Sequence, residues 1–309
     1  MVNKAEKSIA EGYGETPSPH KFAIVTDSAS DISKEIALKN NISIIPIYIH
    51  LNGNEFRDGI DIDSKKIYEL QQKEKAIFST SSPSPHDFIE VYKRLLKKHT
   101  KIFSIHISSN LSAVMKAALI ARDLLDAKED IEIFDSRSGT MGTGFMVLAA
   151  MRAVEKGYSS EKILKVLSFL RENVRLYGTI DTLKYLRRSG RVPAIASFFS
   201  RLLTIKPLLG INNGLVGMIG ISFTRYGSLR EITRRVIRDF KKERWLVVSI
   251  IHTLGFEQSE KILQRLQGSL NIVYSNITKC TPAIGAHTGP GLIGIIVSKL
   301  DREIADLFI

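Results

Sequence analysis

Cysteine is nearly absent from the chain, and several motifs that would indicate a particular chemistry are missing. The single cysteine, Cys280, excludes an internal disulfide bond and a cysteine-based metal cluster. The seven histidines never form a metal-ligand spacing such as HExxH, and neither the phosphate loop GxxxxGK(S/T) nor the nucleophile motif GxSxG occurs. We therefore expect no metal or other cofactor and no nucleotide site.

Long hydrophobic runs are also missing. The longest apolar stretches, such as Phe145–Met151 and Trp245–Ile251, fall well short of the roughly 20 residues that a membrane-spanning helix needs. The first 20 residues are polar and contain no apolar segment of the kind found in secretion signals. We expect residues 1–20 to be a disordered lead-in and the protein to be cytoplasmic.

One short motif imitates a dinucleotide-binding fingerprint. Gly289–Gly294 has the spacing GxGxxG, which binds a pyrophosphate only where it opens a helix. The apolar residues that follow it here predict a strand instead. The motif therefore does not indicate a nucleotide site.

Basic residues outnumber acidic ones, 44 to 32, and give a net charge of +12. Such an excess favours anionic partners, which include nucleic acids, membrane surfaces and acidic proteins. The densest basic segment is Arg225–Arg244, which is alternatively a solvated helix face. Zinc fingers and aromatic RNA-binding motifs are absent from the sequence, so we expect no specific nucleic-acid binding.

The order of apolar segments predicts two domains. Over residues 21–170 short buried strands alternate with amphipathic helices, which is typical of an α/β domain with a parallel sheet. Over residues 171–309 helices are mixed with a hairpin around Asn212-Asn213-Gly214, which is typical of an α+β domain. In the first domain, Ile42–Leu51 is predicted as one strand.

The sequence Lys101–Ala118 predicts a strand, a polar turn and a helix in succession. Ser108 and Ser109 follow the strand, and helical apolar spacing begins at Leu111. Hydroxyls beside the free N–H groups of a helix start can bind a carboxylate or a phosphate. The alternative is that these serines only cap the helix.

A second polar turn precedes this one. Thr80 and Ser81 also follow a predicted strand, and in alternating β/α sequences the strand ends share one edge of the sheet. We therefore expect Thr80 and Ser81 to face Ser108 and Ser109 across a single crevice. His287 lies in what reads as a glycine-rich turn, Gly285–Gly291, whose closely approached backbone favours a site over a structural role.

Several segments, taken in order, resemble the DegV family of bacterial fatty-acid-binding proteins, which serve as the acyl-carrying subunit of fatty acid kinase. The resemblance covers about residues 22–300. The segments that carry it are Asp27-Ser28, Thr80–Pro85, Ser108–Ser112, Asp135–Arg137, Asp181–Leu186 with Gly190-Arg191, and Gly285–Gly291.

The resemblance implies a fatty acid held between the two domains. It implies that Thr80 or Ser81 and Ser108 or Ser109 bind the carboxylate, with His287 beside this head group. It also implies that Arg191 and Arg225 lie where the kinase subunit docks or the phosphate is placed.

The predicted function is that of a carrier that presents a long-chain fatty acid to the ATP-binding subunit of a fatty acid kinase for conversion to an acyl-phosphate. Transient contact with a membrane surface would supply the lipid and suits the basic excess. One alternative is a stand-alone hydrolase or transferase that uses Ser109 or Thr80 with His287. The other is a DNA-binding regulator that uses the basic helix, whose affinity would fall steeply with salt.

Overall fold

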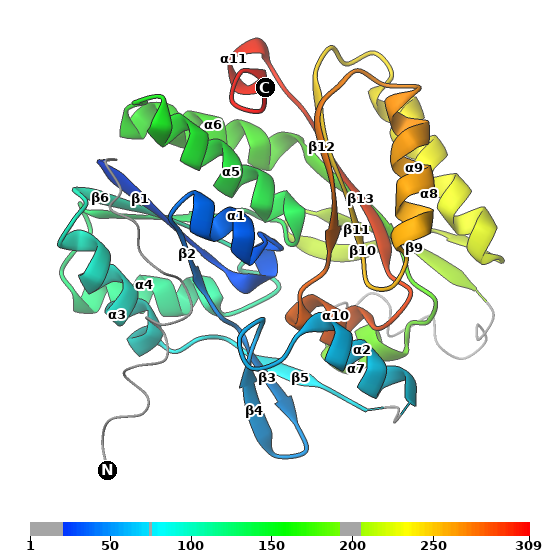
Figure 1. Ribbon diagram of the computed structural model, residues 1–309, viewed down its shortest axis with the longest axis horizontal. Coiled ribbons are helices and arrows are strands. Elements are labelled where there is room, and N and C mark those ends of the chain that lie inside the picture. The colour runs from blue at the N-terminus through cyan, green and yellow to red at the C-terminus, as the bar shows by residue number, and fades with distance from the viewer. Residues whose placement is uncertain (1–20, 74–75, 192–204) are drawn as a thin grey trace.

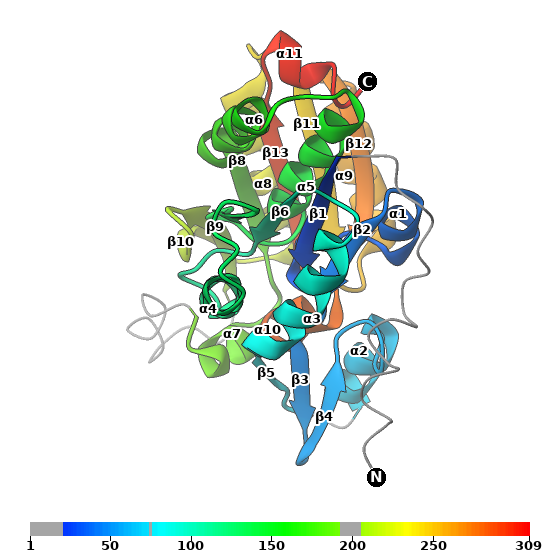
Figure 2. The same ribbon diagram turned by 90° about the vertical axis from the view of Figure 1, so that its left-hand side faces the viewer.

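The computed structural model describes residues 21–73, 76–191 and 205–309, and the lead-in predicted over residues 1–20 lies outside them. Two large sheets lie side by side with helices between and around them (Figure 1). A small third sheet and its helix extend from one end of this assembly (Figure 2).

The first sheet has four parallel strands in the order β2-β1-β6-β7. Alternate side chains of a strand point to opposite faces. Accordingly Ala23 and Val25 pack against α3 and α4, while Ile24 packs against α5. The bounds of these elements are β1 Phe22–Asp27, β2 Ile42–Ile45, β6 Lys101–His106, β7 Ile131–Asp135, α1 Lys34–Lys39, α3 Pro85–Leu96, α4 Val114–Leu124 and α5 Met141–Glu155.

The second sheet has six strands in the order β10-β9-β8-β13-β11-β12, and only the β11–β12 pair is parallel. Helices α8 and α9 cover one of its faces through the apolar cluster around Val236, Leu266 and Ile295. The bounds are β8 Val174–Thr179, β9 Lys206–Asn212, β10 Leu215–Ser222, β11 Leu246–His252, β12 Ile272–Lys279, β13 Ile293–Lys299, α6 Ser160–Asn173, α7 Lys184–Ser189, α8 Arg225–Phe240, α9 Phe256–Gln267, α10 Pro282–Thr288 and α11 Arg302–Ala305.

Helix α5 lies between the two large sheets. It is apolar on all sides and almost entirely buried, as expected for a helix enclosed by packed layers. One continuous core joins Ile24 and Phe103 of the first sheet, Phe145 of α5, and Val247 and Ile296 of the second sheet. The two halves therefore share a hydrophobic core.

Pro46 divides the segment that we predicted as one strand. Proline has no N–H to donate to a sheet, so the chain leaves the parallel sheet after β2 and resumes as β3 (Tyr48–Leu51) in a separate antiparallel sheet. That sheet also contains β4 (Asn54–Arg57) and β5 (Ser79–Ser81), and α2 (Ser64–Lys73) packs on it. The predicted single strand over Ile42–Leu51 is thus wrong.

The predicted fold class is confirmed: a parallel sheet in the N-terminal half is followed by a mixed sheet in the C-terminal half. The domain boundary at residues 170 and 171 stays a prediction, although every strand of the six-stranded sheet lies at or beyond Val174. Within the described ranges, none of the helices combines the length and apolar character that crossing a membrane requires.

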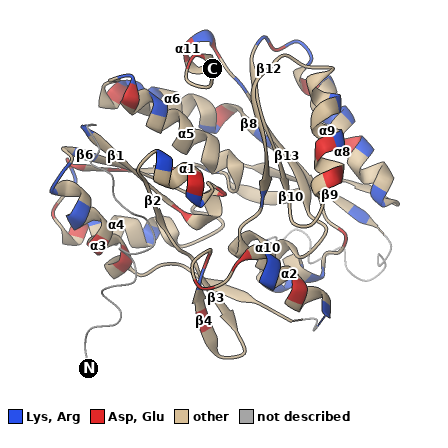
Figure 3. Cartoon of the chain, viewed as in Figure 1, with Lys and Arg blue, Asp and Glu red and all other residues tan. Residues whose placement is uncertain are grey.

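Helix α8 contains most of the basic segment that stands out in the sequence. Arg234 and Arg235 both contact the carboxylate of Glu231, and Arg238 pairs with Asp239. Charges of both signs are interspersed along this helix (Figure 3). The arrangement favours a solvated helix face over a nucleic-acid-binding surface.

Candidate ligand-binding cavity

An apolar cavity of about 130 Å³ lies between the two halves of the molecule. Its walls come from the six-stranded sheet, from the loops that follow β1, β2, β6 and β7, from β5, and from α7 and α10. Aliphatic residues make up most of the lining: Ile47, Ile107, Leu111, Leu176, Leu186, Leu209, Ile211, Val216, Ile251, Ile284 and Leu292, with Ala29, Ala283, Gly139, Gly178 and Gly294. The polar residues in the lining are Thr80, Ser112, Thr140, Arg191, His287 and Thr288.

Thr80 and His287 form a hydrogen-bonded pair in the cavity wall. The Thr80 hydroxyl lies 2.7 Å from His287 Nε2. Burial, and to a lesser extent the positive charge of Arg191, lowers the pKa of His287 from 6.5 to about 4. The imidazole is therefore neutral at neutral pH. A hydroxyl, a neutral imidazole and a guanidinium together can hold a carboxylate by hydrogen bonds.

The position of His287 depends on close packing of α10 against α2. A Cβ atom at Gly285 would lie 2.4 Å from Tyr68 Cε1, so only glycine permits this approach. Tyr68 donates to the carbonyl oxygen of Cys280, and Gln71 donates to that of Gly285. Residues Gly285–His287 thus belong to a helix that begins with Pro282 in its first turn, and the predicted turn at this place is wrong.

The other three predicted carboxylate ligands bond elsewhere. The Ser81 hydroxyl lies 2.8 Å from His50 Nε2, Ser108 donates to the carbonyl oxygen of Gly214 at 2.8 Å, and Ser109 donates to the Asp135 carboxylate at 2.6 Å. None of these three lines the cavity among the residues that the structure describes. Thr80 and Ser112, which belong to the same two polar segments, do line the cavity.

The two predicted polar segments nevertheless meet, although Thr80 and Ser81 lie within β5 of the antiparallel sheet and the predicted turn after a strand of the parallel sheet is wrong there. The hydroxyls of Ser82 and Ser112 lie 3.1 Å apart, and Thr80 and Ser112 line the same cavity. Helix α4 begins at Val114, three residues later than the apolar spacing predicts, because Ser108 to Ala113 form a turn in which Leu111 N–H donates to the Ser108 carbonyl. The serine of the turn that reaches the cavity is therefore the last one, Ser112.

Arg191 and Arg225 occupy different environments. Arg191 lies in the cavity wall, and its guanidinium donates to the carbonyl oxygen of Ser189 at 2.5 Å. Arg225 contacts the Asp181 carboxylate at 3.7 Å, and burial lowers the pKa of its guanidinium. Of these two arginines, Arg191 is therefore the one that is positioned to contact a ligand in the cavity.

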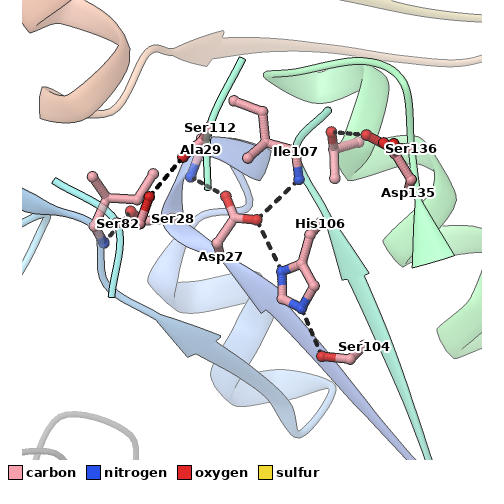
Figure 4. Close-up of polar contacts among 12 residues, drawn as sticks. Asp27, Ser28, Ala29, Ser82, Ser104, His106, Ile107, Ser112, Asp135 and Ser136 are labelled. Atoms are coloured by element: carbon pink, nitrogen blue, oxygen red, sulfur yellow. Dashed lines mark hydrogen bonds and ion pairs between the residues drawn. The ribbon is translucent and has the colours of Figure 1, made fainter. Parts of the chain in front are cut away.

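A buried hydrogen-bond network holds together two of the loops that form the cavity wall (Figure 4). Asp27, at the end of β1, accepts from the N–H groups of Ala29 and Ile107, each at 3.0 Å, and its carboxylate lies 3.0 Å from His106 Nδ1. His106 Nε2 lies 2.7 Å from the Ser104 hydroxyl, which lies 2.7 Å from that of Tyr92. An imidazole protonated at Nδ1 satisfies every member of this chain.

Asp31 and Asp58 are buried close to the start of α10. Asp31 accepts from the N–H of Thr281 at 2.9 Å, and Asp58 accepts from the Ser28 hydroxyl at 2.7 Å. Burial raises the pKa of both carboxyls to about 7, and the charge of Asp58 further raises that of Asp31. The contribution of these two carboxyls to the free energy of unfolding therefore depends on pH.

We expect the free energy of unfolding to fall as pH rises from about 4 to about 7. A carboxyl whose pKa is raised in the folded state binds its proton more tightly there than in the unfolded chain, so the stabilisation is complete below about pH 4 and is lost as the folded carboxyl ionises near pH 7. Urea unfolding at a series of pH values measures this slope. Asp31→Asn or Asp58→Asn should flatten it, whereas Asp130→Asn, at an exposed position, should not. An unchanged slope in both buried variants would contradict the assignment.

Comparison with known proteins identifies the class to which this fold and cavity belong. The family model described as "Uncharacterised protein, DegV family" matches residues 21–300. A DegV domain-containing protein of Staphylococcus aureus (strain MRSA252) is 31% identical over 279 residues, which cover 90% of this chain and 99% of that protein. The chain therefore belongs to the DegV family, as the ordered motifs predict.

Solved structures of relatives have the same fold. A fatty-acid-binding DegV family protein from Thermus thermophilus superimposes with a TM-score of 0.84 at 27% identity, over 91% of this chain and 100% of that one. DegV of Bacillus subtilis, a fatty acid binding protein, gives a TM-score of 0.81 at 28% identity with the same coverage. A stearic acid-binding protein from Eubacterium ventriosum gives 0.78 at 25% identity, over 90% and 98% of the two chains.

Proposed function

We propose that this chain is a carrier that binds a long-chain fatty acid in the cavity between its two halves. The observation that supports the proposal most directly is the character of the wall, which is aliphatic along most of its length and carries Thr80, His287 and Arg191 among its few polar groups. Such a wall suits a long apolar chain with one anionic end. The fatty-acid-binding relatives from T. thermophilus and B. subtilis support the same ligand class.

The apolar tail supplies most of the binding free energy in this proposal. At about 0.8 kcal/mol per buried methylene, some fifteen methylenes contribute roughly 12 kcal/mol before the entropic cost of binding. Each charge-assisted hydrogen bond to the carboxylate contributes about 1.5–3 kcal/mol. The head group therefore orients the ligand, and the tail determines the affinity.

The cavity must widen to accept a complete chain. Its volume of about 130 Å³ is below the roughly 300–1,000 Å³ of typical small-molecule sites. Because the walls come from separate elements, with Leu176 on β8 and Ile284 on α10, we expect these side chains to move apart as the tail enters. Hydrogen exchange measured with and without fatty acid would detect this widening as altered protection on β8 and α10.

Presentation to a kinase is the second part of the proposal. Since the sequence contains no phosphate loop, the ATP would be bound by a separate fatty acid kinase subunit. The Arg191 guanidinium would then lie beside the carboxylate oxygen that attacks the γ-phosphate, where positive charge stabilises the charge that develops. Phe223 and Tyr226, strongly exposed on either side of Arg225, and the basic excess support transient contact with an anionic membrane.

Native mass spectrometry of the purified chain tests the proposal. We expect a bound mass of about 230–290 Da, the range of common acyl chains whose tails drive binding, and rebinding of fatty acid after delipidation. Failure of added fatty acid to bind would refute the carrier function. Formation of acyl-phosphate only when ATP and a kinase subunit are both added would support presentation, and turnover of esters by the chain alone would favour an enzyme instead.

Thr80→Val should weaken fatty-acid binding by about 10-fold or more, because it removes a hydroxyl that can donate to the carboxylate and leaves the volume of the side chain nearly unchanged. Titration with a fluorescent fatty acid measures this change. Ser109→Ala is the matched control, because that hydroxyl is bonded to Asp135. If Ser109→Ala weakens binding as much as Thr80→Val does, the head group lies at the turn predicted from sequence and not at Thr80.

A further inference from the structure

A second cleft is lined by residues of α6, β8, β9 and β10 and of the loop that follows β7. Its volume is about 400 Å³, within the range of small-molecule sites. Three segments form it: the loop after β7 with Arg137, the α6–β8 junction with Arg171 and Arg175, and the β9–β10 hairpin with Asn212 and Asn213.

Three arginines line this cleft and a single acidic residue, Glu172, opposes them. The side chain of Arg137 is exposed and forms no ion pair with an acidic residue in the described ranges. The guanidinium carbon of Arg171 lies 4.8 Å from the centre of the Phe134 ring. Its Nε lies 3.6 Å from the Glu172 carboxylate, which is an ion-pair contact but too long for a hydrogen bond. The cleft therefore keeps a net positive charge.

Two of the three guanidinium groups are held in place largely by uncharged partners. Arg175 donates to the carbonyl oxygens of Glu172 and Val174 at 2.8 and 2.9 Å, and Arg171 stacks on an aromatic ring. Such contacts fix the orientation of an arginine without neutralising its charge. Less conformational entropy is then lost when an anion binds.

The backbone at two sides of the cleft is also constrained. Arg137 has a φ of 47°, a left-handed conformation that is uncommon for a non-glycine residue, and its N–H donates to the Asp135 carboxylate at 2.8 Å. The β9–β10 hairpin is tied to the other half of the molecule because Asn110 and Ser108 donate to the carbonyls of Asn213 and Gly214. The walls are thus held in a defined position.

We propose that this cleft binds a small phosphate-bearing metabolite, such as a phosphate monoester or a diphosphate. The planar fork of arginine matches the geometry of phosphate oxygens, and three such groups around one cleft suit a compact ligand of two or more negative charges. The site is distinct from the apolar cavity, although Leu176 and Ile211 contribute to both walls. Because its residues come from both halves, an anion bound there would also stabilise their arrangement.

Isothermal titration calorimetry of the full chain with sodium pyrophosphate, at constant ionic strength, tests this site. We expect saturable binding and a rise in the melting temperature. Arg137→Gln should weaken binding by about 10-fold, because one charge-assisted hydrogen bond is lost, and Arg137→Lys by less. Arg230→Gln removes an equally exposed charge on α8 and is the matched control, which should bind as the unmodified chain does.

Three results would overturn the proposal. The first is an absence of saturable binding of pyrophosphate and of inorganic phosphate. The second is an equal loss of affinity in Arg137→Gln and Arg230→Gln, which would mean that only the net charge attracts the anion. The third is binding of citrate as tight as that of pyrophosphate, which would exclude a preference for phosphate. Arg137 has an exposed side chain, so its variants should fold, and an unchanged urea midpoint verifies this.

Discussion

Gly178→Leu is expected to reduce the affinity for long-chain fatty acids by roughly 100-fold. Gly178 on β8 pairs with Gly294 on β13, and both line the apolar cavity. A Cβ at Gly178 would lie 3.4 Å from the nearest atom, Leu176 Cδ2, so the first carbon is accommodated and a longer side chain extends into the cavity. Displacing about four methylenes of the ligand costs about 3 kcal/mol.

Titration with acids of increasing length measures the effect of Gly178→Leu. The variant should retain affinity for short acids and lose it for long ones, because the pair of glycines provides room for the tail. Gly217→Leu is the matched control, since that strand glycine has open space around it and does not line the cavity. Full affinity of Gly178→Leu for long-chain acids would show that the tail lies elsewhere.

Asp27→Ala should lower the free energy of unfolding by about 3–5 kcal/mol. The carboxylate is fully buried, and its removal leaves the N–H groups of Ala29 and Ile107 and the Nδ1 of His106 without a partner. Each unsatisfied buried group costs about 1–3 kcal/mol. Fatty-acid binding should weaken as well, because Ala29 and Ile107 form part of the cavity wall.

Urea unfolding of Asp27→Ala and of Asp135→Ala tests the importance of burial. Asp135 is the last residue of β7 as Asp27 is the last residue of β1, and it also accepts from a neighbouring hydroxyl and from backbone N–H groups. Those bonds are exposed to water, so Asp135→Ala should cost less than about 1 kcal/mol. Similar losses in the two variants would mean that the buried network contributes no more than an ordinary loop contact.

The strands, helices and hairpin of this protein could be predicted because each depends on local pattern. Ile102 to Ile107 and Leu215 to Ser222 read as strands from their apolar composition and turn boundaries, and the structure has strands at Lys101–His106 and Leu215–Ser222. The break at Pro46 was also encoded locally, because proline cannot donate to a sheet, but the apolar residues on both sides concealed it. Local errors of this kind move an element without changing the fold class.

The choice among neighbouring hydroxyls could not be predicted in the same way. Ser108 lies in the right turn, yet its hydroxyl bonds to the carbonyl of Gly214, more than a hundred residues later in the chain. Ser112 of the same motif lines the cavity instead. The only signal available in the sequence was that both turns contain several serines, which does not distinguish one from another.

The cleft lined by Arg137, Arg171 and Arg175 was not predicted, because no motif in the sequence indicated it. Arg137, the last residue of the motif Asp135–Arg137, is separated from Arg175 in the chain, and only the packing of α6 and β8–β10 beside the first sheet brings the two together. In the basic segment that was evident in the sequence, Arg225–Arg244, the arginines Arg234, Arg235 and Arg238 pair with acids along α8. The net charge of a segment therefore did not indicate where unpaired positive charge could bind an anion.

The sequence by itself determined the family, the fold class and the polar turn after β6, because ordered motifs and apolar periodicity act over short ranges. Only the tertiary structure decided that Thr80, Ser112, Arg191 and His287 share one cavity wall while Ser81, Ser108 and Ser109 bond elsewhere. The reason is physical: a side chain's partner depends on atoms brought near it by the packing of two sheets, and those atoms come from distant parts of the chain.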